Sequence, residues 1–409
     1  MMKSWLWLLF IGVLCLKGWA GEVPKTLLLS WEGDPCTTMT AQWLRGPGLG
    51  DRPEKGKGEE VRWKKAGDPT WQVVRSTTTE FPDPQKMGMP RWSLSRVRWK
   101  GLKAGQEYVF QVEDSPEQKF RTAPLEMGEE LTFAEGGDAD STRAAEEMLT
   151  LACRKNPLFF SLGGDISYSD GKDVAREIRF WEMWHRVAHG TDGKLIPFVP
   201  GIGNHEVQGG YWQERATFAD MKKRAPFFFA LFGGLYQRDE PVALDFGDYL
   251  SLLLLDTGHV TPMDRQTVWL QKNLAMRGGV PWVFVSWHIA CYPSARKWNA
   301  QVMSGFARDH WIPLIEKSKA TAVFNHHDHD MQRVQSEGKG GRKVMVLGNG
   351  SIGVEPRGAV CEESIPMRKA YAQENYVNIV TLRKQSVEVV TLGRKGRELD
   401  RVEFSKRSK

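Results

Sequence analysis

Cysteine is scarce in this sequence, and no two cysteines form a C-x-x-C pair. Only five cysteines occur among 409 residues, so a zinc site built from thiolates is not expected. Long runs of one charge are also missing, because the 56 basic and 50 acidic residues are interspersed. With a net charge of +6 and no nucleic-acid recognition motif, the chain has the composition of an ordinary globular protein rather than a nucleic-acid-binding one.

Hydrophobic runs long enough to span a bilayer are absent as well. The apolar run from Trp5 to Leu16 is too short. Lys3 precedes it and Gly18-Trp19-Ala20 follows it, which is the arrangement of a secretory signal peptide. We therefore expect residues 1–20 to be cleaved and the protein to be secreted or periplasmic, with an uncleaved amphipathic anchor as the alternative.

An exported chain would keep four cysteines, at positions 36, 153, 291 and 361. An oxidising compartment permits a disulfide between them without requiring one. If one bridge forms, we expect it between Cys291 and Cys361, because both residues follow strands that carry candidate site residues.

Residues 24–124 have the pattern of a small all-β domain. Stretches rich in β-forming residues are separated by turns containing glycine and proline. The predicted strands cover residues 26–31, 39–44, 60–64, 71–75 and 108–113. The segment Leu102–Tyr108 resembles the tyrosine corner of fibronectin type III domains, in which the Tyr108 hydroxyl bonds back to the main chain.

From residue 130 to residue 405, apolar strand patterns alternate with helical patterns. Strands are predicted at 131–134, 158–162, 196–199, 242–246, 251–255, 282–286, 321–325 and 343–347, and helices at 142–154, 174–189, 264–276 and 306–317. Period-two alternation at 376–382 and 387–392 predicts a closing antiparallel pair. This pattern is typical of an α/β domain, and open α/β sheets carry their chemistry at the carboxyl ends of the strands.

Five short stretches place metal-capable residues at the ends of hydrophobic runs. They are Gly136–Asp138, Gly163–Tyr168, Gly203–Glu206, Trp287–His288 and His326–His329. Glycine lets the backbone turn sharply and lets an ion approach closely. Together the stretches supply candidate ligands of the types that hold two metal ions beside a phosphate ester. These ligands are Asp138, Asp165, Tyr168, Asn204, His288, His327 and His329.

The candidate ligands divide into two sets by charge. Asp138, Asp165 and Tyr168 with one histidine would be three anions and an imidazole, which suits ferric iron. A phenol titrates at about pH 10, so it binds as phenolate only beside a strongly charged ion. Asn204 and two histidines, sharing Asp165, would be less negative and would suit Zn, Mn or ferrous iron.

The order GGD…GGDxxY…GNHE…WH…HxH resembles that of the calcineurin-like metallophosphoesterases, and Tyr168 makes it similar to the purple acid phosphatases among them. The resemblance covers nearly all of the chain after the signal segment. It implies a fibronectin type III-like domain over residues 24–124. It also implies a catalytic domain over residues 130–405 with a four-layer α/β/β/α sandwich.

The resemblance also implies a role for each candidate residue. Asp138, Asp165, Tyr168 and His329 would hold the first ion, and Asp165, Asn204, His288 and His327 would hold the second. Asp165 would bridge the two ions. His205 would act above them as the catalytic residue that stabilises the phosphate or protonates the leaving alkoxide, and Asn204 and His205 would contact the substrate.

A protein of this kind would be an exported acid phosphatase that hydrolyses phosphate monoesters by direct attack of a metal-bound hydroxide. Its cofactors would be Fe(III) at the Tyr168 site and Zn, Mn or Fe(II) at the other, and its partner a small phosphoester. One alternative is a Zn- or Mn-dependent phosphodiesterase of the same superfamily, acting on nucleotide or phospholipid-type diesters. The other is a non-catalytic surface-binding protein.

Three stretches depart from the family pattern, and in one of them, Asp330–Arg333, only Arg333 matches. His326 stands where a glycine usually precedes the first histidine of the HxH pair. It is either a tolerated substitution turned away from the site or a phosphate-binding or spare ligand. Arg296 and Lys297 stand where plant-type enzymes carry substrate-contacting histidines. Arg296 is therefore a candidate substrate-binding residue, with an ordinary solvated side chain as the alternative.

Overall fold

The computed structural model describes residues 22–53, 56–85 and 91–406. The predicted signal peptide at residues 1–20 lies outside the described residues. Within the described ranges, no helix has both the length and the apolar character needed to cross a bilayer.

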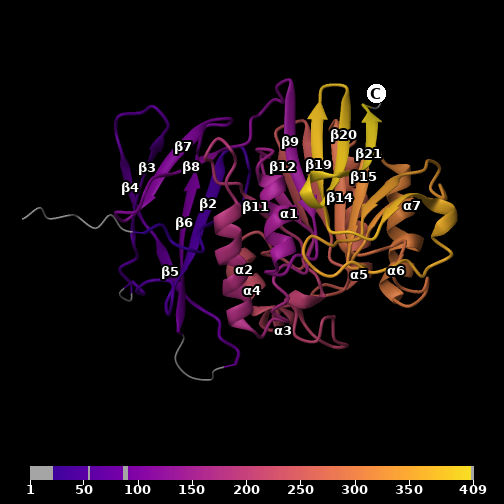
Figure 1. The fold of residues 1–409 in the computed structure, drawn as a ribbon, viewed down its shortest axis with the longest axis horizontal. Coiled ribbons are helices and arrows are strands. Elements are labelled where there is room, and N and C mark those ends of the chain that lie inside the picture. The colour runs from indigo at the N-terminus through magenta and orange to yellow at the C-terminus, as the bar shows by residue number, and fades with distance from the viewer. Residues whose placement is uncertain (1–21, 54–55, 86–90, 407–409) are drawn as a thin grey trace, which may run out of the picture.

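The N-terminal region consists of two four-stranded antiparallel sheets (Figure 1). The first contains β1 (Leu28–Ser30), β2 (Thr38–Arg45), β6 (Trp92–Lys100) and β5 (Thr77–Phe81), in that order. The second contains β4 (Gln72–Arg75), β3 (Glu60–Lys65), β7 (Glu107–Val112) and β8 (Gln118–Arg121). The five strands expected from the sequence are present. The strands β5, β6 and β8 were not predicted. In β5 the residues TTTEF are mostly exposed and lack apolar alternation.

Aromatic side chains join these two sheets. The ring of Trp99 in β6 lies 5.3 Å from Phe110 in β7 and 5.4 Å from Phe120 in β8, and all three side chains are buried. The Tyr108 hydroxyl accepts a hydrogen bond of 2.8 Å from the Lys103 backbone N–H. This contact confirms the backward bond expected of a tyrosine corner.

Two larger sheets form the rest of the protein. The six-stranded sheet has the order β11 (Phe198–Pro200), β10 (Phe160–Leu162), β9 (Glu130–Gly136), β19 (Tyr376–Arg383), β20 (Ser386–Gly393), β21 (Glu398–Ser405). The seven-stranded sheet has the order β12 (Val242–Phe246), β13 (Leu250–Leu254), β14 (Trp282–Ile289), β15 (Ala322–His326), β17 (Met345–Gly348), β16 (Met331–Gln335), β18 (Arg368–Ala372). The strands that lead to the candidate ligands run parallel within each sheet.

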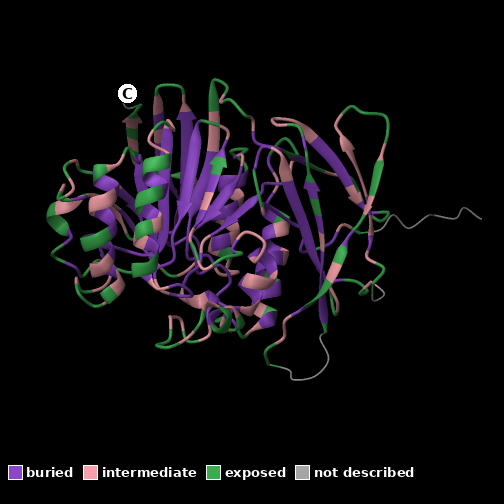
Figure 2. Cartoon of the chain, turned by 180° about the vertical axis from the view of Figure 1, so that it is seen from behind, coloured by how far each residue is buried: buried purple, intermediate pink, exposed green. Residues whose placement is uncertain are grey.

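The inner faces of these two sheets pack against each other. Phe133 in β9 meets Phe284 in β14 edge to face, with ring centroids 5.6 Å apart. Successive strand residues point to opposite faces, so Val283 and Val285, on either side of Phe284, face outward. There they pack with Leu270 in a separate buried cluster. The central strands of both sheets are therefore buried (Figure 2), whereas the edge strands β18 and β21 contain only half-buried and exposed residues.

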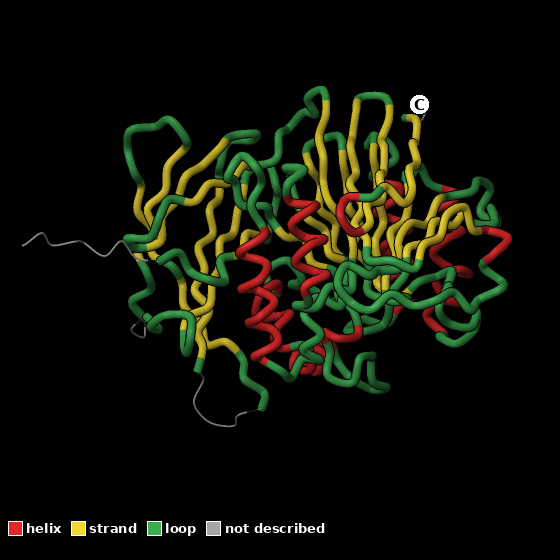
Figure 3. The backbone as a smooth tube through the Cα atoms, in the orientation of Figure 1, coloured by secondary structure: helices red, strands yellow, loops and turns green. Residues whose placement is uncertain are grey.

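Helices cover the two outer faces (Figure 3). The six-stranded sheet is covered by α1 (Arg143–Cys153) and α2 (Val174–Val187). The seven-stranded sheet is covered by α5 (Met263–Met276), α6 (Val302–Phe306) and α7 (Ile312–Lys317). Two short helices, α3 (Phe218–Arg224) and α4 (Pro226–Phe232), lie between β11 and β12 in the chain. The result is the expected four-layer α/β/β/α arrangement.

The predicted helix at 306–317 is interrupted in the structure. A wider π-helical turn, Ala307–Trp311, separates α6 from α7, and Pro313 lies in the first turn of α7. Proline has no backbone N–H and cannot close the regular helical bond to the preceding turn. The periodicity of the apolar residues persists through this change, so the sequence pattern predicted one continuous helix.

The predicted disulfide is wrong. Cys36, Cys153, Cys291 and Cys361 are free, buried thiols in the structure. Cys291 donates its S–H to Asn325 Oδ1 at 3.1 Å, while Cys361 lies 3.4 Å from a carboxylate oxygen of Glu363. Following site-bearing strands did not bring the two sulfur atoms together, because each thiol is packed against its own local partner.

Candidate metal centre

The seven predicted ligands all lie at the carboxyl ends of strands or in the loops that follow them. Asp138 follows β9, while Asp165 and Tyr168 follow β10. Asn204 begins a short 3₁₀ turn after β11. The histidines come from the other sheet, His288 near the end of β14 and His327 and His329 directly after β15. Each sheet therefore supplies one part of the site.

Five of these seven residues have a left-handed backbone. The φ angles are 59° at Asp138, 53° at Asp165, 54° at Tyr168, 77° at His327 and 63° at His329. Non-glycine residues adopt this conformation at a cost, and such strain concentrates at functional sites. The fold therefore holds these side chains at the sheet edge in a conformation that the local sequence alone does not favour.

Asp138, Tyr168 and His329 form the first cluster. The Tyr168 hydroxyl lies 3.3 Å from Asp138 Oδ1 and 3.1 Å from His329 Nε2, and His329 Nε2 lies 3.2 Å from the same Asp138 oxygen. The other Asp138 oxygen accepts a hydrogen bond from the His327 backbone N–H at 2.9 Å. Three members of the acidic, tyrosine-bearing set predicted from the sequence thus lie within 3.3 Å of one another.

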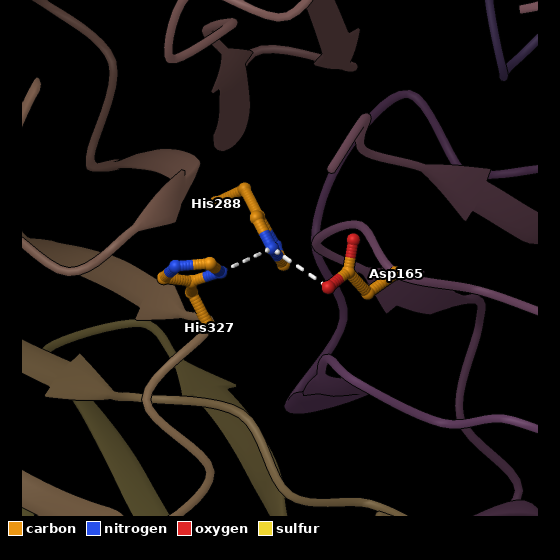
Figure 4. Close-up of side chains that lie close together, drawn as sticks. All are labelled: Asp165, His288 and His327. Atoms are coloured by element: carbon orange, nitrogen blue, oxygen red, sulfur yellow. Dashed lines mark hydrogen bonds and ion pairs between the residues drawn. The ribbon is translucent and has the colours of Figure 1, made fainter. Parts of the chain in front are cut away.

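Asp165, His288 and His327 form the second cluster (Figure 4). His288 Nε2 lies 3.2 Å from Asp165 Oδ2 and 3.2 Å from His327 Nδ1. The opposite nitrogens are held from behind, His288 Nδ1 by the Gly163 carbonyl at 3.1 Å and His327 Nε2 by the Gln301 side chain at 2.8 Å. Metal-binding histidines are usually oriented in this way through their second nitrogen.

Two oxygen atoms test whether these residues fit metal ions. Asp165 Oδ2 and Asn204 Oδ1 are both buried. Asn204 Oδ1 has no hydrogen-bond partner within the described part of the chain, and Asp165 Oδ2 has no partner there beyond its ion-pair contacts with His288 at 3.2 Å and His205 at 3.9 Å. Leaving buried polar atoms unpaired is costly unless something else binds them. Both atoms belong to residues assigned to the second ion, so the donor set fits a cation there.

The charged and titratable groups of the site shift one another's pKa values. Burial is the largest single effect and would raise the pKa of Asp138 and Asp165. The surrounding histidines, with His288 the strongest of them, together outweigh burial and lower both pKa values. Burial would lower the pKa of His288, yet the two carboxylates raise it to about 9. Burial and the Asp138 charge raise the pKa of Tyr168 well above its usual value. Ionising this phenol therefore requires a strong cation beside it.

His205 is placed over the clusters. Its ring centroid lies 4.2 Å from that of Tyr168, and its Nε2 lies 3.9 Å from Asp165 Oδ2. On its other side, Nδ1 lies 2.5 Å from Asp170 Oδ1. The imidazole is about one-third exposed, so its Nε2 edge can reach a molecule bound at the ligand cluster.

A protein-family model agrees with this arrangement. Residues 134–331, which include all seven candidate ligands, match the family of calcineurin-like phosphoesterases. The chain contains a calcineurin-like phosphoesterase domain. A binuclear metal site is typical of this family, and the clusters described above lie where such a site is expected.

Solved structures with the same fold support the placement of the phosphoesterase domain. A purple acid phosphatase from yellow lupin (Lupinus luteus) seeds superposes with a TM-score of 0.73 at 14% identity, covering 94% of this chain and 74% of that one. PhoD superposes with a TM-score of 0.64 at 15% identity, covering 94% of this chain and 89% of that one. No curated protein matches the chain in sequence. At these identities the likeness concerns the fold.

Arg296 of the phosphoesterase domain is engaged with the loop that carries the histidines. Its Nη1 donates to the His327 carbonyl at 3.0 Å and to Asp328 Oδ1 at 2.5 Å. The side chain is about a quarter exposed, so it is not the freely solvated group of the alternative prediction. Lys297 beside it is exposed. Contact between Arg296 and a substrate stays a prediction.

His326 is turned away from the ligand clusters and into the protein. Its side chain is fully buried, and its Nε2 lies 3.2 Å from Glu135 Oε1. Burial lowers the pKa of His326 to about 3 and raises that of Glu135 to about 8. The contact is therefore one between two neutral groups over most of the pH range. Of the two predictions for His326, this placement agrees with the side chain turned away from the site.

Three supporting residues were missed or only partly foreseen from the sequence. Glu206, the last residue of the Gly203–Glu206 stretch, accepts backbone hydrogen bonds from Gly203, Asp165 and Ile166 at 2.7–2.8 Å. Asp170 and Gln301 were not singled out, since a lone aspartate or glutamine carries no motif. Only the spacing of Asp170, two residues after Tyr168, offered a signal.

Proposed function

We propose that this protein is an exported phosphatase that hydrolyses small phosphate monoesters at a centre of two unlike metal ions. The observation that carries the proposal is the triad Asp138, Tyr168 and His329, whose polar atoms lie within 3.1–3.3 Å of one another. A phenol in this position suits a ferric ion, and a divalent ion such as Zn, Mn or Fe(II) suits the Asn204 and histidine set. Two cations so held would activate a water nucleophile and neutralise charge on the phosphate.

The side chains of the protein supply positioning and proton transfer. Asp165 contacts His288 of the second set and is proposed to be the residue that both ions share. His205, oriented by Asp170, presents Nε2 toward the cluster, where it would stabilise the phosphate or protonate the leaving alkoxide. Arg296 borders the second set and is proposed to contact the phosphate once its bond to Asp328 is exchanged. Residues 24–124 are proposed to form a fibronectin type III-like domain before the catalytic domain of residues 130–405.

Metal analysis and a pair of substrates test this proposal. The purified protein should hold two ions per chain and absorb visible light when iron is supplied. It should hydrolyse nitrophenyl phosphate faster than the bis ester. A colourless, active protein that prefers the bis ester would instead establish the Zn- or Mn-dependent phosphodiesterase.

The variant Asp165→Asn tests the assignment of the ligands. It should lose both ions and turnover, because one carboxylate serves both positions. The matched control is Asp140→Asn, which changes a carboxylate that also has positive φ but pairs with Arg176 at 2.6 Å. Unchanged metal content in Asp165→Asn would refute the assignment. Two retained ions with no turnover of any phosphoester in the wild type would favour a non-catalytic binding protein.

A further inference from the structure

Glu135 and His326 meet between the two large sheets. Glu135 lies in β9 of the six-stranded sheet and His326 ends β15 of the seven-stranded sheet. Both side chains are fully buried, and Glu135 Oε1 lies 3.2 Å from His326 Nε2. This polar contact therefore lies among the apolar side chains that pack the two sheets together.

Two glycines make room for the His326 ring. A Cβ atom on Gly163 would overlap the imidazole around Nε2, and a Cβ on Gly137 would come within 2.5 Å of Nδ1. These glycines belong to the two GGD stretches that lead to Asp138 and Asp165. The imidazole therefore fits directly against the backbone of both carboxylate-bearing loops.

A chain of polar contacts extends from this pair. Asn378 Nδ2 donates to Glu135 Oε2 at 2.9 Å, and the Thr391 hydroxyl donates to Asn378 Oδ1 at 2.8 Å. On the other side, His326 Nε2 lies 3.5 Å from the Ser286 hydroxyl. The His326 ring is nearly parallel to that of His288, at a centroid distance of 6.3 Å. These contacts thus extend from Thr391 in β20 to His326, whose ring lies beside that of the candidate metal ligand His288.

The fold keeps this pair although it is poorly satisfied. Apart from the contact between Glu135 and His326 itself, the buried atoms Glu135 Oε1 and His326 Nδ1 have no polar partner among the described residues. Replacing such a pair by apolar side chains of similar volume is often neutral or stabilising. Stability of the core alone therefore does not account for a glutamate and a histidine at this place.

We propose that Glu135 and His326 are a positioning pair that fixes the spacing of the two sheets beneath the metal centre. The inference rests on the proposed function, because it assumes that ions bind there. Each ion would take ligands from both sheets, with Asp138, Asp165 and Tyr168 on one side and the histidines on the other. A directional polar contact sets this spacing more sharply than apolar packing, which has no preferred direction.

A double-mutant cycle tests the positioning role. The variants are Glu135→Leu, His326→Leu and the double variant, with Glu135→Gln as the conservative replacement that keeps a polar contact. Ser251→Ala is the matched control, because it removes a buried hydroxyl that bonds Asp245 in β12 at 2.6 Å. Two quantities are measured, the thermal unfolding midpoint of the metal-free protein and the Zn²⁺ dissociation constants by competition with a chelator.

Each single leucine variant should lower the unfolding midpoint, because it leaves its partner buried and unpaired. The double variant should have an unfolding midpoint near the wild-type temperature. Its Zn²⁺ affinity should nevertheless stay about 10–100-fold weaker than wild type, the usual effect of losing an outer-shell contact. Glu135→Gln should bind Zn²⁺ nearly as well as wild type, and Ser251→Ala should change only the midpoint.

Two results separate failure of this inference from failure of the proposed function. If the wild type binds two Zn²⁺ ions and the double variant binds them equally well, the pair is only structural and the inference is wrong. Recovery of affinity and midpoint together in the double variant would likewise show that the pair is only structural. If the wild type itself binds no Zn²⁺ ions, the proposed metal centre is wrong.

Discussion

His205 is joined to Asp170 by a contact of 2.5 Å between Nδ1 and Oδ1. The contact leaves Nε2 facing the cluster, 3.9 Å from Asp165 Oδ2. Asp170 therefore selects which edge of the imidazole would meet a substrate in the proposed reaction. It fixes the tautomer in the way that carboxylates orient catalytic histidines in general.

This pairing predicts graded losses of turnover. His205→Ala should lower kcat by about 10²–10⁴-fold, the usual contribution of a positioned acid or base. Asp170→Asn should give a smaller loss, because the imidazole remains but its orientation is no longer fixed. Metal content measured beside steady-state kinetics should stay at two ions in both variants. A larger effect of Asp170→Asn than of His205→Ala would contradict this order of roles.

Tyr168→Phe should abolish visible absorption in iron-loaded protein and weaken binding of the first ion. The phenyl ring fills the same buried space, so only the hydroxyl contacts with Asp138 and His329 are lost. Tyr236→Phe is the control, since its buried hydroxyl donates to the Pro200 carbonyl at 2.6 Å and belongs to neither cluster. Absorption spectra and iron titrations measure the effect. A coloured Tyr168→Phe protein would exclude this tyrosine as the chromophore.

Glu206→Gln should destabilise the site more than the same change at Glu177. Glu206 accepts hydrogen bonds from three backbone N–H groups, and these groups can only donate. In the glutamine variant the side-chain N–H₂ would face a backbone N–H, so that two donors would meet. The cost should be about 1–3 kcal/mol in the free energy of unfolding. Glu177 accepts two serine hydroxyls on one oxygen and Trp181 on the other, and hydroxyls can rotate to accept from an amide. Denaturant unfolding that shows equal losses would argue against the backbone anchoring role.

The metal-free protein should lose stability in acid partly through His185. Burial first, and then the charge of His189, lower its pKa to about 4. An unfolded chain binds this proton near the ordinary histidine pKa of about 6.5, whereas the folded chain does not. Stability is therefore present above about pH 6.5 and falls as the pH drops toward 4. His185→Gln should make the fall between pH 6.5 and 4 shallower in chemical unfolding experiments, and an unchanged slope would contradict this assignment.

Local patterns in the sequence were sufficient to predict most of the elements. Strands such as β12 and helices such as α1 carry strong apolar periodicity, and their predicted bounds agree with the structure within one or two residues. Exposed or interrupted elements were harder, as the polar strand β5 and the π-helical turn before Pro313 show. In both cases the local pattern of apolar residues does not show which element forms.

The sequence by itself determined the chemistry of the candidate ligands. Carboxylates, a phenol, an amide and histidines at strand ends are sufficient to predict two unlike metal positions, because parallel strands bring their carboxyl ends to one edge. Only the tertiary structure decided which nitrogen of each histidine faces the cluster and that Asp170 orients His205. It also showed that His326 packs against Glu135 and that Cys291 and Cys361 stay apart. Contacts of this kind join residues from separate loops and sheets, and their distances follow from how the two sheets pack rather than from any spacing along the chain.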